Sequence, residues 1–185
     1  MPIKVISQGN IGASLGRESV QKSILAGLVG LSIVFIFMVG NYGRLGVIAD
    51  ISLLIYGLLT LALYKLIPIV ITLPGIAGFL LSVGMAVDAN ILIFERMKEE
   101  LRSGKPIRAA MELGFGRAWN SIRDANVATL ITCFILFNPL NWGFLNNSGM
   151  VRGFALTLSL GIFIGLFTGI VVSRTLIRMF YKGTK

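Results

Sequence analysis

Residues 23–64 read SILAGLVGLSIVFIFMVGNYGRLGVIADISLLIYGLLTLALY, two apolar blocks separated by a single basic residue, Arg44. Each block is close to the roughly 20 residues that an α-helix needs to cross the ~30 Å hydrocarbon core of a bilayer. Because the turn between them holds only a few residues around Gly43, the blocks predict an antiparallel hairpin of two membrane helices, over 23–43 and 45–64. The hairpin indicates an all-α membrane fold.

Three more apolar stretches follow, and together they predict a bundle of about five transmembrane helices. We expect the later spans at residues 73–94, 127–145 and 153–173. Thr72 with Pro74 two positions later suits the start of the third span, since proline is tolerated in the first turn of a helix. The fourth span is built on a short apolar run that continues past Pro139. The transmembrane domain as a whole is expected to cover residues 23–180.

The composition of the 185-residue chain agrees with a membrane protein and excludes several other classes. Hydrophobic residues make up 55% and charged residues 14%, whereas an ordinary soluble domain is roughly a quarter charged. Histidine is absent, and Cys133 is the single cysteine, inside an apolar run where packing explains it. The sequence therefore offers no metal site, disulfide or histidine-based acid–base pair, and we expect no enzymatic activity and no cofactor.

The positive charge follows the membrane rather than a nucleic acid. The formal net charge is +9, but the lysines and arginines lie in the segments between the apolar blocks. The segments on one side of the membrane hold twelve of them, mainly within residues 95–126 and the tail, and those on the other side hold five. The positive-inside rule makes the richer side cytoplasmic, so we expect the N-terminus outside and the tail 181–185 inside.

Residues 1–22 are expected to form an external segment that leads into the membrane. They lack the basic and then apolar layout of a signal peptide. An external N-terminus without such a signal favours a longer natural protein, in which another span and an external domain precede this chain.

The segment 95–126, between the third and fourth spans, is expected on the cytoplasmic side. A short helix is predicted to open at Lys105 and Pro106 and to close at Gly114, and apolar residues continue at helical spacing beyond it. This aromatic and basic pattern is equally compatible with an amphipathic stretch at the membrane surface and with a solvated connector.

Small residues recur at every fourth position of the last span. They are Gly153, Thr157, Gly161, Gly165, Gly169 and Ser173. Glycine is common in membrane helices, but six small residues in register favour a packing seam, because they let a neighbouring backbone approach closely. Gly75, Gly78 and Ser82 give the third span a shorter version of the same pattern.

Asp88 lies inside the third span, seven residues before Glu95 and hence about 10 Å along the helix axis from the cytoplasmic end. No span has a lysine or arginine in its interior, so the carboxyl group must be protonated, reach water or pair with a charge from another chain. A group that gains and loses a proton as its surroundings change suits a proton relay. Asp88 could instead, with Asn90, be a hydrogen-bonding anchor between helices. We favour the relay, since a neutral asparagine would anchor without the cost of a buried charge.

Three further residues are secondary candidates for the relay. Asn90 shares the span of Asp88. Asp50 lies only six residues after Arg44, where a solvated acid near the end of a helix is expected. Asp124, just before the fourth span, is expected at the membrane interface.

The stretch from Leu73 to Gly104, LPGIAGFLLSVGMAVDANILIFERMKEELRSG, contains three motifs: Leu-Pro-Gly-Ile-Ala-Gly at the helix start, Val-Asp-Ala-Asn around Asp88, and Phe-Glu-Arg. With Asp124-Ala125-Asn126 and a Val-Arg-Gly-Phe-Ala run at the start of the last span, it resembles the SecD/SecF family of protein-export membrane proteins, within the resistance-nodulation-division superfamily. Val-Asp-Ala-Asn is the form typical of the SecD branch. The resemblance covers nearly the whole chain, although the connection 137–150 is longer than usual.

The resemblance implies half of a membrane domain that pairs with SecF around a pseudo-two-fold axis and acts with the SecYEG channel. It also implies use of the proton gradient to draw exported chains outward, with the aspartate of Val-Asp-Ala-Asn, here Asp88, as the proton-relay acid. The implied location is a bacterial-type inner (cell) membrane. The external domain that touches the translocating preprotein is expected to be contributed from outside these 185 residues.

Two other functions share some of these features. A small-molecule or lipid exporter of the same superfamily would have the same fold and the same buried acid, but the Val-Asp-Ala-Asn and Phe-Glu-Arg pattern argues against it. A purely structural membrane scaffold would have no need for a titrating Asp88.

Overall fold

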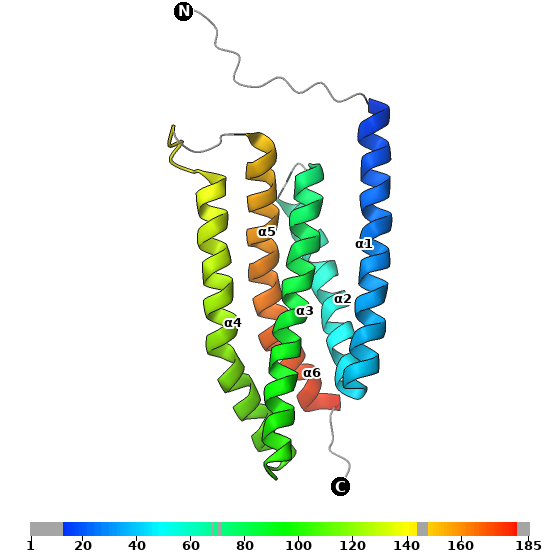
Figure 1. Cartoon of the computed structure of the whole chain (residues 1–185), viewed down its shortest axis with the longest axis vertical. Helices are drawn as coiled ribbons and strands as arrows, with labels where there is room; N and C mark the ends of the chain where they lie inside the picture. The colour runs from blue at the N-terminus through cyan, green and yellow to red at the C-terminus, as the bar shows by residue number, and fades with distance from the viewer. Residues whose placement is uncertain (1–12, 68, 70–71, 144–147, 181–185) are drawn as a thin grey trace, which may run out of the picture.

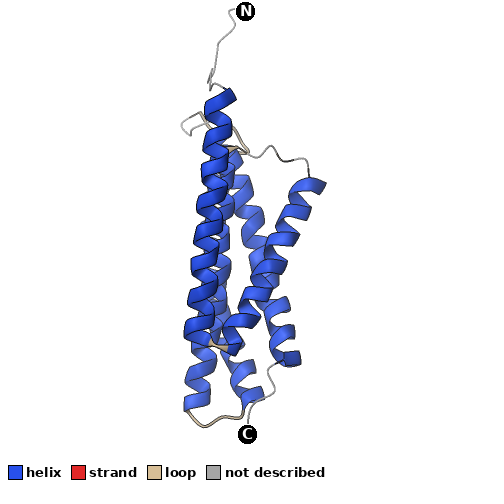
Figure 2. Ribbon diagram, turned by 90° about the vertical axis from the view of Figure 1, so that its right-hand side faces the viewer, coloured by secondary structure: helices blue, strands red, loops and turns tan. Residues whose placement is uncertain are grey.

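The computed structural model describes residues 13–67, 69, 72–143 and 148–180. The described residues form α-helices and one π-helical turn, with no strand: α1 (Ala13–Tyr42), α2 (Arg44–Leu66), α3 (Leu73–Arg102), α4 (Ile107–Phe137), α5 (Gly149–Phe167), η1 (Thr168–Val172) and α6 (Ser173–Phe180). The five long helices pack side by side with their axes roughly aligned, and α1 and α2 run in opposite directions (Figures 1 and 2). The predicted fold class, an all-α membrane bundle, is confirmed.

Four helical segments of the described chain are long and apolar enough to cross a membrane. They are Gly16–Tyr42, Arg44–Leu66, Leu73–Arg102 and Gly149–Phe180. The last of these is one continuous helical segment, since α5, η1 and α6 follow each other without a break. α4 is not among the four, because charged residues are spread over its first half and only the part after Asn126 is uniformly apolar.

α4 ends at Phe137, so the predicted extension of the fourth span to residue 145 is wrong. Pro139 disfavours helical backbone at the residue before it, and Asn138 accordingly leaves the helix with a left-handed φ of 46°. The Asn138 side chain then stabilises a turn, in which its Oδ1 accepts a hydrogen bond from the Trp142 amide at 2.9 Å. Residues 144 and 145 of the predicted span lie outside the described part of the chain.

A single residue, Gly43, separates α1 from α2. Its φ of 52° and ψ of −120° suit glycine, which has no side chain to clash. Just after the turn, Gly46 packs so closely on α1 that a Cβ atom there would lie 2.0 Å from the Met38 carbonyl oxygen. The two helices therefore form a tight hairpin. α1 begins at Ala13, so part of the segment 1–22 is helical, and residues 1–12 lie outside the described part.

α3 begins at Leu73, the residue at which the Thr72 and Pro74 pair predicts a helix start. The Thr72 Oγ1 accepts a hydrogen bond from the Gly75 amide at 3.2 Å, and Pro74 lies in the first turn. The helix continues to Arg102, beyond the predicted end of the span at residue 94. The first residues of the segment 95–126 therefore extend the same helix.

The first half of α4 packs on protein and continues past the predicted end of the short helix. The helix is unbroken from Ile107 to Phe137, so Gly114 does not close a short helix. Gly114 instead lets α4 approach α3, since a Cβ atom there would lie 2.9 Å from the Met97 amide nitrogen. One apolar face of this half is buried in the bundle core, through Ala110, Met111, Phe115, Ala118 and Ile122. The first half of α4 is therefore part of the bundle, while Leu113 and Trp119 remain exposed.

α3 and α5 run parallel to each other along a seam of small residues. The contacting pairs along it are Gly153–Thr72, Thr157–Gly78, Gly161–Ser82, Gly165–Ala86 and Gly169–Ala89. The approach is closest at Gly161, where a Cβ atom would lie 2.2 Å from the Ser82 Oγ. Rows of residues spaced by four that interlock are a common form of close helix packing. We refer to these five pairs as the α3–α5 seam.

Candidate functional site

α3 is the central helix of the bundle and has two different faces (Figure 1). Its buried face includes Gly75, Gly78, Ser82, Ala86 and Asn90. On the other side, four exposed residues follow the helical spacing i, i+4, i+7 and i+11: Ala77, Leu81, Gly84 and Asp88. The helix therefore uses one face to hold the bundle together and leaves a narrow strip uncovered, which we call the open face of α3.

Asp88 lies on the open face and is exposed. Among the described residues, no lysine or arginine nitrogen comes within 4.0 Å of its carboxylate oxygens. In a bilayer this carboxyl group must meet lipid, water or another chain. Asp88 lies seven residues before Glu95, or about 10 Å along the helix axis, so contact with lipid alone is costly for the charged form.

Asn90, two residues further on, points into the bundle and is 3% exposed. The Ser173 hydroxyl donates a hydrogen bond of 2.7 Å to the Asn90 Oδ1 and lies 3.0 Å from the Ser52 hydroxyl. The Asn90 Nδ2 in turn donates to the Ala86 carbonyl oxygen at 3.3 Å. Ser52, Asn90 and Ser173, which we call the polar triad, therefore join α2, α3 and α6 at nearly the same depth as Asp88.

The other two secondary candidates are not brought to Asp88. Asp50 on α2 is half-buried, and its Oδ1 is buried without a hydrogen-bond partner in the described chain. Asp124 on α4 is exposed and pairs with its neighbour Arg123 at 2.9 Å. No hydrogen bond joins any two of the three carboxyl groups in the described part of the molecule.

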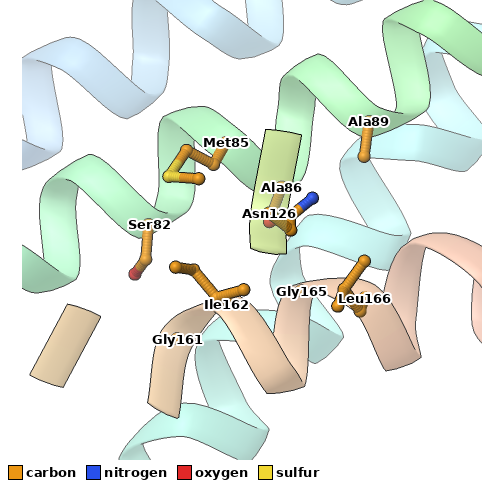
Figure 3. Close-up of a pocket in the computed structure, with 9 residues that line it drawn as sticks. All are labelled: Ser82, Met85, Ala86, Ala89, Asn126, Gly161, Ile162, Gly165 and Leu166. Carbon is orange, nitrogen blue, oxygen red and sulfur yellow. The ribbon is translucent and has the colours of Figure 1, made fainter. Parts of the chain in front are cut away.

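A second buried polar contact lies beside the seam. The Tyr56 hydroxyl is 2.6 Å from the Ser82 Oγ, and Ser82 donates to the Phe79 carbonyl oxygen at 2.7 Å. Ser82 and Asn126 are the polar side chains of a small pocket between α3, α4 and α5 (Figure 3). The other residues that line it are Met85, Ala86, Ala89, Gly161, Ile162, Gly165 and Leu166. Because this lining is small and mostly apolar, the pocket is a packing gap beside the seam rather than a ligand site.

The polar residues of α2 are functional candidates that the sequence argument missed. Ser52, Tyr56, Thr60 and Tyr64 recur at every fourth position, and all four are buried. The Tyr64 hydroxyl donates to the Thr157 carbonyl oxygen at 3.1 Å, so this row contacts the last span directly. The four-residue spacing that identifies the glycine stripe of the last span would also have found this row.

The end of the bundle formed by α6 and the first half of α4 is held by ion pairs. Glu112 on α4 pairs with both Arg174 and Arg178 on α6. Hydrogen bonds from these two guanidinium groups, Arg178 contributing most, hold the pKa of the Glu112 carboxyl below its ordinary value. This carboxylate therefore stays charged and ties the first half of α4 to the last helix.

Several basic residues of the segment 95–126 make ion pairs or ring contacts at the same end of the bundle. Glu100, whose side chain is only 3% exposed, pairs with Lys105 and Arg117. The Lys98 ammonium lies 4.0 Å from the centre of the Tyr42 ring. The charges that predict the membrane orientation thus also hold the ends of the helices together.

The geometry defines a class of protein: an all-helical membrane bundle whose central helix presents an acid on an uncovered face. A family model described as "Protein export membrane protein SecD/SecF, C-terminal" matches residues 2–183. The chain therefore belongs to the SecD/SecF family, in its C-terminal membrane region, and the resemblance drawn from the motifs is confirmed.

Individual relatives agree with this assignment. The chain is 52% identical over 176 residues to protein translocase subunit SecD of Synechocystis sp., covering 95% of this chain and 36% of that protein. It is 49% identical over 187 residues to protein translocase subunit SecD of Dehalococcoides mccartyi, covering 100% of this chain and 40% of that protein. It thus spans less than half the length of these relatives.

The fold is also similar to a solved structure, described as the crystal structure of SecDF in a super-membrane-facing form. The TM-score is 0.83 at 38% sequence identity, and the match covers 94% of this chain and 23% of that one. The helical arrangement described here is therefore that of a family member, and the rest of the longer relative lies outside the matched region.

Proposed function

We propose that this chain is the membrane half of a Sec protein-export subunit that couples the proton gradient to the outward movement of translocating polypeptides. Family membership and the names of the relatives, which are translocase subunits, support the export role. Since the chain spans under half of those proteins, contact with the preprotein is assigned to the remainder of the full-length subunit.

The observation that carries the proton-coupling part is the position of Asp88 on the open face of α3. Removal from water favours the neutral form of a carboxyl group, whereas water or a nearby cation favours the charged form. If a neighbouring helix covers and uncovers this face, Asp88 takes up and releases a proton as the two surfaces move. Proton movement and helix movement are then one process.

The partner that covers the open face is proposed to be SecF, with SecYEG as the channel on which the pair acts. Two residues of the open face, Ala77 and Gly84, are small, and a Cβ atom at Gly84 would meet nothing within 4 Å in this chain. Small residues permit close approach of another helix in a membrane. A basic residue of the partner would supply the charge that the described residues do not offer to Asp88.

The proposed location is a bacterial-type inner membrane with the N-terminus outside and the C-terminus in the cytoplasm. The excess of lysine and arginine on the side of residues 95–126 supports this orientation. Of two cysteines introduced at the exposed Ser103 and Gly143, in a Cys133→Ala background, the one at 143 should react with an impermeant thiol reagent from outside and the one at 103 only from the cytoplasmic side. Reaction at 103 from outside would contradict the orientation.

The test of the function is export driven by the proton gradient in vesicles that contain the complete native protein and its partners. Asp88→Asn keeps the size of the side chain but cannot titrate, so it should preserve assembly and abolish the response of export to the gradient. Glu99→Gln is the control, because that acid is exposed, pairs with Arg96 on the same helix and is no candidate for the relay. If the Asp88→Asn protein still exports at the wild-type rate and slows when the gradient collapses, the relay lies elsewhere, and Asp50 is the next residue to test.

A further inference from the structure

The last membrane helix changes its geometry immediately before it meets the polar triad. Thr168–Val172 form the π-helical turn η1, and Ser173 follows it directly. Hydrogen bonds in a π turn join residues five apart instead of four, so the turn accommodates one extra residue in the helix. Such turns within α-helices are frequent at functional sites.

The π turn explains why Ser173 faces α3. Each four-residue step along an α-helix of 3.6 residues per turn rotates by about 40°. An uninterrupted α-helix would therefore place Ser173 about 40° further round the helix axis than Gly169. The wider turn reverses this rotation, and Ser173 comes within 2.7 Å of Asn90.

The residue after Ser173, Arg174, contacts a different helix, α4. Arg174 pairs with Glu112 on α4, and its guanidinium carbon lies 5.7 Å from the centre of the Phe115 ring. Arg178, one turn later, pairs with the same carboxylate. Two consecutive residues, Ser173 and Arg174, thus connect the start of α6 to α3 and to the first half of α4.

We propose that Ser173 is a positioning residue that couples the part of α3 bearing Asp88 to α6 and, through Arg174, to the cytoplasmic half of α4. This proposal rests on the proposed role of Asp88. The Asn90 amide is held at both ends, by Ala86 and by Ser173, and the polar triad is buried, so no water can replace the bond when it breaks. A shift of α3 at Asp88 must therefore move α6 with it.

The test compares export with and without the proton gradient, in vesicles containing the complete native protein and its partners. Ser173→Ala should reduce the increment due to the gradient roughly fivefold or more, the effect of losing one buried hydrogen bond, with little change in gradient-independent export. Ser173→Cys, of similar size with a weak S–H donor, should keep an intermediate increment. Thr175→Ala is the matched control, because its hydroxyl bonds only within the helix, to the Val171 carbonyl oxygen; it should export like wild type.

A double variant tests whether the bond itself is responsible. Ser173→Ala combined with Asn90→Ala should be no worse than the more affected single variant, since each change removes the same hydrogen bond. A full gradient increment in Ser173→Ala would overturn the proposal. So would a proportional fall of both export rates, because that result describes a general loss of structure.

Amide hydrogen exchange separates this proposal from the proton-relay role of Asp88. Ser173→Ala should raise exchange in α6 and in the first half of α4 together, whereas Thr175→Ala should not. If exchange in α4 does not change in Ser173→Ala, the proposed coupling through Ser173 is wrong, whatever the export rate of Asp88→Asn. If Asp88→Asn retains gradient-driven export while both helices respond to Ser173→Ala, the proton relay is wrong and the positioning link stands.

Discussion

The α3–α5 seam and the contact between α4 and α6 hold the same bundle together by different forces. At the seam, backbones approach through small residues, and none of its five described pairs contains a charged side chain. At the contact between α4 and α6, Glu112 pairs with Arg174 and Arg178, whose side chains are 37% and 55% exposed. In lipid there is no hydrophobic driving force between helices, so close packing supplies the attraction. Where side chains are exposed to water, ion pairs add a small part of the attraction between helices.

This difference means that the two contacts should respond to different changes. The seam should depend on the size of side chains and hardly on salt or pH. The ion pairs should depend on both, because exposed charges are screened by salt and lost by protonation. Substitutions that change one property at a time can test this distinction.

The largest effect is expected from Gly161→Leu at the seam. A Cβ atom there would lie 2.2 Å from the Ser82 Oγ and 2.9 Å from the Tyr56 hydroxyl, so any side chain must push these groups aside. Overpacking of this kind costs about 1–3 kcal/mol or more. Thermal unfolding in detergent should show a clear loss of stability that added salt does not change.

Gly84→Leu is the control for that variant, because Gly84 lies on the open face of α3 with nothing within 4 Å of an added Cβ atom. The isolated chain should unfold at the wild-type temperature. In the complete native protein the same leucine should weaken assembly with the partner subunit, measured by co-purification. Equal stability of the two leucine variants in the isolated chain would show that the seam is only a compositional pattern.

A smaller effect is expected from Glu112→Gln at the contact between α4 and α6. The two arginines lower the pKa of this carboxyl in the folded state, so the unfolded chain binds the proton more readily. The contribution of the pair to stability is therefore complete above the ordinary glutamate pKa of about 4.3 and is lost as the pH falls through the lower folded value.

Unfolding of wild type and Glu112→Gln should thus differ near neutral pH, by at most about 1 kcal/mol for an exposed pair. The difference should shrink in acid and in high salt. A difference that stays constant from neutral pH into acid would mean that Glu112 stabilises the contact by packing rather than by charge.

Much of the fold could be predicted because it depends on local sequence. The length of each apolar block indicates a membrane span, and Thr72 followed by Pro74 marks the start of α3. The end of α4 was also recoverable, since Asn138 before Pro139 is a helix-stop signal. The apolar residues beyond it, such as Trp142, hid that signal because they look like more of the span.

The candidate site was only partly predictable. The depth of Asp88 follows from counting residues, whereas the polar triad joins Ser52, Asn90 and Ser173 across separations of 83 and 121 residues. No local pattern relates such distant positions. The π turn that brings Ser173 to Asn90 likewise exists only when the last helix is packed against its neighbours.

The sequence by itself determined that this chain is a bundle of membrane helices and that Asp88 is an acid deep in its third span, because hydropathy and helix rise are local properties. Only the tertiary structure decided what each face of that span does. Asp88 and Asn90 are two residues apart, and a helix directs such residues to nearly opposite sides. Which side enters the core depends on the fit of whole helix surfaces: Asn90 joins the polar triad, and Asp88 is left on the open face.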